Sequence, residues 1–78
     1  MPDALTFSDL KLGMSARVVQ VDKRAVFCDR LLELGLLPQT EFKVTKVAQF
    51  GDPIEIDVRG YKLCLRRAEC DCLRVEIL

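Results

Sequence analysis

The chain has 78 residues and a mass of 8.9 kDa, which is room for one small domain with a single hydrophobic core. Its 12 basic and 12 acidic residues cancel, so no net field favours binding to nucleic acid or anionic lipid. Of all residues, 50% are apolar and 31% are charged, and no apolar run approaches the ~20 residues that cross a bilayer. We therefore expect one soluble globular domain spanning residues 1–78.

The N-terminal segment predicts a helical turn followed by a strand. Residues 6–12 are compatible with one turn of helix, with Ser8 as its cap and Gly13 as the left-handed residue that ends it. Residues 15–22 contain a cluster of β-branched valines, which is typical of a strand.

A short amphipathic helix is predicted next, over residues 25–34. Phe27, Leu31 and Leu34 recur at helical spacing, and charged residues fall toward the opposite side. Gly35 follows at the position where a left-handed residue commonly ends a helix.

Alternation of apolar and polar residues then predicts three strands. Residues 40–48 alternate but change parity at their end, as a bulged strand does. Residues 54–58 and 61–65 alternate on either side of Arg59-Gly60, which predicts a hairpin with a two-residue turn.

The C-terminal segment predicts a helical turn and a last strand. Residues 66–71 show no alternation, whereas Leu73, Val75 and Ile77 alternate and are expected to point inward. The sum is about five short strands and one α-helix. This pattern favours a mainly β fold, a small curled antiparallel barrel, over a parallel α/β sheet.

Several classes of enzyme are excluded by missing residues. The sequence has no histidine, which removes the most common general base and the imidazole metal ligand. Neither phosphate-binding glycine pattern, GxxxxGK[ST] or GxGxxG, occurs. Glu55 and Asp57 fall on the polar face of a predicted strand, as solvated charges do. We expect a protein that is not an enzyme.

The cysteines are the residues best suited to bind a transition metal. Cys64, Cys70 and Cys72 offer soft thiolates, although one C-x-C pair is not the double C-x₂₋₄-C pattern of structural zinc sites. Small buried or half-buried thiols are the simpler interpretation, also for Cys28. The first residues lack an export signal, so we expect a cytoplasmic protein with reduced thiols.

Two surface features suggest contacts with other molecules. Residues 32–38 contain more leucines than one inward-facing stripe needs, so Leu32, Leu36 or Leu37 either closes the end of the core or serves as an exposed anchor. Arg66 and Arg67 form a basic pair beside Lys62, which on a neutral domain is typical of a solvated face.

Three strings in a fixed order carry a family resemblance: LLELGLLPQTEFKV, GDPIEIDVRGYKLCLRRAEC and LRVEIL. They resemble the FeoA family of small bacterial accessory proteins of ferrous iron transport over nearly the whole chain. The chain departs from that pattern at Gln39, where the family usually has glycine, and at Cys64 and Cys70, where alanine is common. A residue with a Cβ at position 39 resists the positive φ that glycine adopts.

The resemblance implies an SH3-like barrel acting in the cytoplasm with FeoB, the ferrous iron permease that carries a GTP-binding domain. It does not imply DNA binding. From charge, apolar run lengths and motifs we also expect no nucleic-acid partner, no direct membrane insertion and no cofactor. The alternative is a small metal-binding protein, an iron chaperone or sensor that binds Fe²⁺ through Cys64, Cys70 and Cys72. The chain could also form a weak homo-oligomer by pairing through an unpaired strand edge, and the sequence does not decide this point. We place the partner surface at Leu32, Leu36, Leu37 and Pro38 together with Gly51, Asp52 and Pro53.

Overall fold

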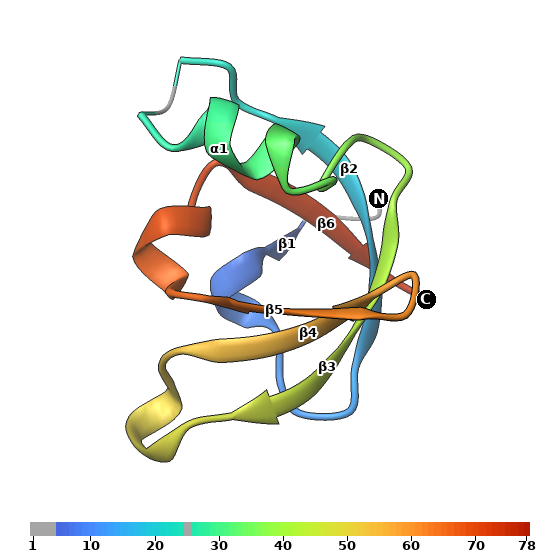
Figure 1. Cartoon of the computed structure of the whole chain (residues 1–78), viewed down its shortest axis with the longest axis vertical. Helices are drawn as coiled ribbons and strands as arrows, with labels where there is room; N and C mark the ends of the chain where they lie inside the picture. The colour runs from blue at the N-terminus through green and yellow to red at the C-terminus, as the bar shows by residue number, and fades with distance from the viewer. Residues whose placement is uncertain (1–4, 25) are drawn as a thin grey trace.

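The computed structural model describes residues 5–24 and 26–78, and within them it has six short antiparallel strands and one α-helix (Figure 1). The strands follow the order β1-β6-β2-β3-β4-β5 in one sheet. In chain order the elements are β1 (Leu5–Thr6), the 3₁₀ turn η1 (Phe7–Asp9), β2 (Ser15–Val21), α1 (Cys28–Glu33), β3 (Glu41–Val47), η2 (Gln49–Gly51), β4 (Ile54–Val58), β5 (Tyr61–Leu65), η3 (Arg67–Cys70) and β6 (Leu73–Ile77).

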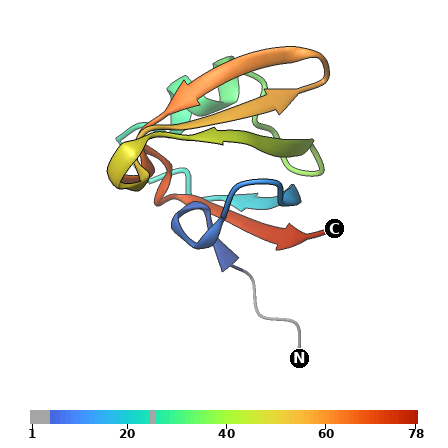
Figure 2. The same ribbon diagram turned by 90° about the horizontal axis from the view of Figure 1, so that it is seen from below.

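The sheet is curled so that its two halves face each other. Figure 2 shows β3, β4 and β5 lying over β2, β6 and β1. The edge strands β1 and β5 do not pair with each other, so the barrel stays open along one side. The expected mainly β fold of small antiparallel barrel type is confirmed, with six strands in place of five.

The core fills the space between the two halves of the sheet. The rings of Phe7 and Phe42 lie 6.1 Å apart between centroids. Thr40 is the one polar residue among the buried residues described, and its hydroxyl donates a hydrogen bond of 3.2 Å to the carbonyl oxygen of Gly35. The core therefore buries no polar side chain without a partner in the described part of the chain.

The predicted hairpin and bulge are both confirmed. Val58 pairs with Tyr61, and the two residues between them have φ values of 53° at Arg59 and 96° at Gly60. Positive φ at both positions is the signature of a type I′ turn, which matches the twist of the two strands. The register between β3 and β4 shifts between Val44 and Lys46, as the change of parity predicted.

The N-terminal predictions need correction. The predicted helical turn is only the three-residue η1, and Ser8 lies inside it rather than at its N-cap. The N-cap is Thr6, whose backbone N–H donates to Asp9 Oδ2 at 2.9 Å. The sixth strand, β1, was not predicted. Its two residues pair with Val75 and Arg74 at the other end of the chain, and so short a strand shows no alternation.

The helix and the last strand also differ in part from the predictions. Residue 25, where the helix was expected to begin, lies outside the described residues, and α1 begins at Cys28. Phe27 precedes it with 39% of its surface exposed, so Cys28 and Leu31 form its buried face. The inward placement of Ile77 is wrong, because this residue is exposed at the end of β6, whereas Leu73 and Val75 are buried as predicted.

Candidate partner-binding surface

The corner after α1 is built by a glycine C-cap. Gly35 has φ of 98°, and its N–H donates to the carbonyl oxygen of Leu32 at 3.0 Å. The next N–H, of Leu36, donates to the carbonyl oxygen of Leu31 at 3.0 Å, which completes a Schellman-type end. This geometry turns the side chain of Leu36 into the core.

The predicted leucine surface is therefore only partly exposed. Leu36 has 0% exposure, so its place on a partner surface is wrong, whereas Leu37 is 48% exposed and Pro38 is exposed. Leu32 is half-buried against the core. The accessible part of this corner consists of Leu37 and Pro38.

Two contacts fix the corner against the sheet. The Tyr61 hydroxyl donates a hydrogen bond of 2.6 Å to the carbonyl oxygen of Leu34. A Cβ added at Gly35 would lie 2.5 Å from the same hydroxyl. Gln39 adopts φ of 77° despite its Cβ, and its N–H donates to the Val18 carbonyl oxygen at 2.7 Å. The turn thus keeps the left-handed conformation that the family's usual glycine would favour.

Arg67 holds the Gly51–Pro53 turn through hydrogen bonds. The Arg67 backbone N–H donates to Asp52 Oδ1 at 2.8 Å, and Arg67 Nε donates to the Gly51 carbonyl oxygen at 2.7 Å. The guanidinium also donates to the backbone carbonyl oxygens of Ser8 and Leu10. The interpretation of Arg67 as part of a solvated face is wrong, since this side chain links the turn to η1 and to Leu10, which follows η1.

Phe50, directly before this turn, was missed in the sequence. Its side chain is 95% exposed and its backbone is left-handed, with φ of 71°. Both features are unfavourable for a free phenylalanine, and exposed aromatic residues are enriched where proteins meet. The sequence did contain a signal, because Phe50 is an aromatic residue outside any alternating segment and directly precedes the Gly51-Asp52-Pro53 turn.

The three candidate metal-binding cysteines lie in different surroundings. Cys64 is exposed on β5, whereas Cys70 and Cys72 are buried. Burial, with a smaller contribution from the neighbouring Cys72 thiol, raises the pKa of Cys70 to about 12. Among residues 5–24 and 26–78, no group of three or more histidine, cysteine, aspartate or glutamate side chains is arranged to hold a metal ion.

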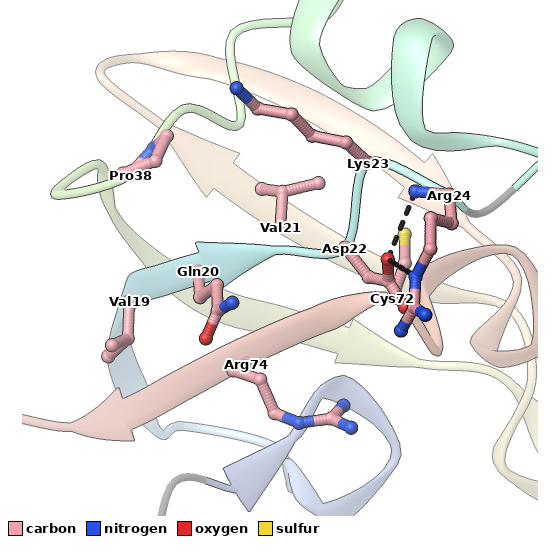
Figure 3. A pocket seen from close by; sticks show the side chains of 9 residues that line it. All are labelled: Val19, Gln20, Val21, Asp22, Lys23, Arg24, Pro38, Cys72 and Arg74. Carbon is pink, nitrogen blue, oxygen red and sulfur yellow. Dashed lines mark hydrogen bonds and ion pairs between the residues drawn. The ribbon is translucent and has the colours of Figure 1, made fainter.

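An open groove of about 600 Å³ runs over β2 and β6, next to the corner at Pro38 (Figure 3). Val19 and Gln20 of β2 line it together with Pro38 and Arg74. The turn after β2 contributes Asp22, Lys23 and Arg24, and Val21 and Cys72 lie at its base.

Taken together, these features define a small SH3-like β domain that presents exposed loops and an open groove on its surface. In the described part of the chain, no helix has the length and apolar character needed to cross a membrane.

The FeoA domain family matches residues 5–77, so the chain belongs to the FeoA family, which is involved in ferrous iron transport. The resemblance seen in the sequence is thereby confirmed. A relative from Porphyromonas gingivalis, an Fe(2+) transport protein A/Fe(2+) transporter FeoB fusion protein, is 31% identical over 74 residues. That alignment covers 95% of this chain and 9% of the relative, so the chain spans a small part of the relative's length.

Solved structures agree with the family and the fold. An FeoA-like protein from Clostridium acetobutylicum has a TM-score of 0.92 at 26% identity, over 100% of this chain and 91% of that one. FeoA from Stenotrophomonas maltophilia, complexed with zinc and described as a procaryotic SH3 domain protein, has a TM-score of 0.78 at 28% identity. That match covers 94% of this chain and 91% of the S. maltophilia chain. The SH3-like fold is therefore shown.

Proposed function

We propose that this protein is a non-enzymatic accessory protein that binds a ferrous iron permease of the FeoB type at its cytoplasmic side. The observation that carries the proposal is the fusion protein of P. gingivalis, in which FeoA-like and FeoB parts share one chain. Linking two modules raises their effective concentration for each other, which is useful when they act in contact. Binding would modulate the assembly of the permease or its GTP-coupled transport.

The turn that presents Phe50 is the best candidate for this contact. The side chain projects into solvent, and the hydrogen bonds from Arg67 to Gly51 and Asp52 hold the neighbouring backbone in place. A pre-formed aromatic anchor loses little conformational entropy on binding. Leu37 and Pro38 form a second accessible apolar segment at the helix corner.

The proposal is tested by titrating the ¹⁵N-labelled chain with the cytoplasmic GTP-binding domain of a FeoB permease. The titration is run under reducing conditions, once with GDP and once with a non-hydrolysable GTP analogue. We expect amide shifts at residues 50–53, and a loss of affinity of at least about tenfold for Phe50→Asn.

Val26→Asn is the matched control, because Val26 is 91% exposed and lies on a different loop. It should bind as the wild type does. Absence of shifts in both nucleotide states would contradict binding to this domain, and equal effects of the two variants would contradict the assigned surface.

A metal-binding role through Cys64, Cys70 and Cys72 is the second candidate. The zinc complex of the S. maltophilia relative favours it, although the described residues of this chain do not form a ligand group. Anaerobic Fe²⁺ titration of the wild type and of a Cys70→Ser/Cys72→Ser double variant separates the two functions. Weaker binding by the double variant would support this role, and unchanged binding would refute it.

A further inference from the structure

The groove over β2 and β6 has a local excess of positive charge. Lys23, Arg24 and Arg74 line it with one carboxylate, Asp22, although the chain as a whole has a formal charge of zero. Asp22 is already engaged, because its Oδ1 accepts hydrogen bonds from the Arg24 N–H at 3.0 Å and from Arg24 Nε at 3.3 Å. Within the described residues, neither Lys23 nor Arg74 forms an ion pair.

Apolar side chains line part of the floor and rim of the groove, beside the polar Gln20. Val19 and Pro38 are exposed, and Val21 lies nearly buried at the base. In Figure 3 the Lys23 side chain extends toward Pro38 on one side of Val21, and Arg74 lies on the other side, beyond Gln20. Val21 and Lys23 thus lie on one side of β2, and Val19, Gln20 and Arg74 lie on the other, so apolar and cationic side chains occur together along this part of the strand.

Along the groove, one edge of β2 is also unpaired among the described strands. β2 pairs with β3 only over Ser15–Arg17, and the hydrogen bonds between Val18 and the segment at Gln39 and Thr40 end that contact. The following residues of β2 pair with β6 alone among the described strands. A strand paired on one side can accept an extended segment along its other side.

We propose that this groove binds an extended acidic peptide segment of a partner protein, with carboxylates interspersed with small apolar side chains. The carboxylates would pair with Lys23 and Arg74, and an apolar side chain of the peptide would cover the exposed Val19. At about 3.3 Å per residue, the four residues from Val19 to Asp22 accommodate a segment of four or five residues. The proposal is independent of binding to the permease through the Phe50 turn.

The test uses two synthetic peptides and the ¹⁵N-labelled chain. The probe is Ac-Glu-Val-Glu-Val-Glu-NH₂, and the neutral control replaces each glutamate with glutamine. We expect the acidic peptide to shift the amides of residues 19–24 and 74, with a severalfold loss of affinity when ionic strength rises from about 50 to about 300 mM. Equal shifts with the glutamine peptide would overturn the proposal.

Charge-reversal variants locate the site. Lys23→Glu/Arg74→Glu should weaken binding of the acidic peptide at least about tenfold. Lys11→Glu/Lys46→Glu changes the net charge equally at exposed positions outside the groove and should bind within about twofold of the wild type. Equal losses in both variants would refute the assigned groove.

Two further measurements separate loss of binding from loss of folding, and peptide binding from general anion binding. If charge reversal perturbs the fold, Lys23→Gln/Arg74→Gln removes the charges without introducing repulsion, and the same loss of binding is expected. Inorganic phosphate is titrated separately. If phosphate competes at concentrations comparable to the peptide, the groove is a general anion site and the peptide assignment is wrong.

Discussion

Replacing Phe50 with asparagine should weaken partner binding while making the domain more stable. The left-handed backbone at Phe50, with φ of 71°, costs a non-glycine residue about 1 kcal/mol, whereas asparagine tolerates it. Because the side chain is 95% exposed, the apolar area lost is only about 10 Å², worth ~0.3 kcal/mol. The net gain should be about 0.5–1 kcal/mol, which raises the Tm of a domain of this size by roughly 3–6 °C.

Thermal and urea denaturation of the isolated domain measure this gain. Phe50→Ala is the matched control, because alanine removes the ring but keeps the left-handed strain, so its stability should stay within about 0.5 kcal/mol of the wild type. Both variants should lose affinity for the permease domain. A destabilisation of Phe50→Asn by more than about 1 kcal/mol would refute the reasoning, since it would mean that the ring packs against the domain.

Three other variants or treatments test the structure. Arg67→Met removes the guanidinium hydrogen bonds to backbone carbonyls and should cost about 2–3 kcal/mol in urea denaturation. Arg66 forms an ion pair of 3.8 Å with Asp52 at an exposed position, so Arg66→Met should cost less than about 0.5 kcal/mol. Equal costs of the two variants would contradict the role of Arg67 in holding the Gly51–Pro53 turn. Gly35→Ala places a Cβ 2.5 Å from the Tyr61 hydroxyl at φ of +98° and should cost about 3 kcal/mol. That cost should fall to roughly 1–2 kcal/mol in a Tyr61→Phe background, and strict additivity in the double-mutant cycle would argue against this contact. Iodoacetamide at pH 8 should label exposed Cys64 first and leave buried Cys70, with a pKa of about 12, unmodified; early modification of Cys70 by mass spectrometry would disprove its burial.

Local signals in the sequence predicted much of the fold. The turn at Arg59-Gly60 and the bulge in β3 depend on neighbouring residues, so composition and alternation were sufficient. β1 depends on pairing between Leu5 and Val75, which are far apart in the chain, and a strand of two residues has no period to detect. The sixth strand was therefore beyond sequence reasoning.

The candidate surface was predicted less well because exposure is a tertiary property. Leu36 and Leu37 are adjacent leucines of similar hydrophobicity, yet the glycine C-cap buries the first and leaves the second half-exposed. Similarly, Arg66 and Arg67 are adjacent arginines, and the sequence does not show which of them contacts the rest of the domain. Only Arg67 reaches the backbone carbonyl oxygens of Ser8 in η1 and of Leu10 after it.

The position of β6 affects when this domain can fold during synthesis. β6 comprises Leu73–Ile77, is the last strand in the chain, and lies between β1 and β2 in the sheet. The ribosome therefore releases β1 and β2 long before the strand that joins them exists, and the apolar faces of both strands stay uncovered until then. Folding must follow the synthesis of residue 77. In a fusion that continues beyond this domain, translation of the next part would begin before the first part has closed.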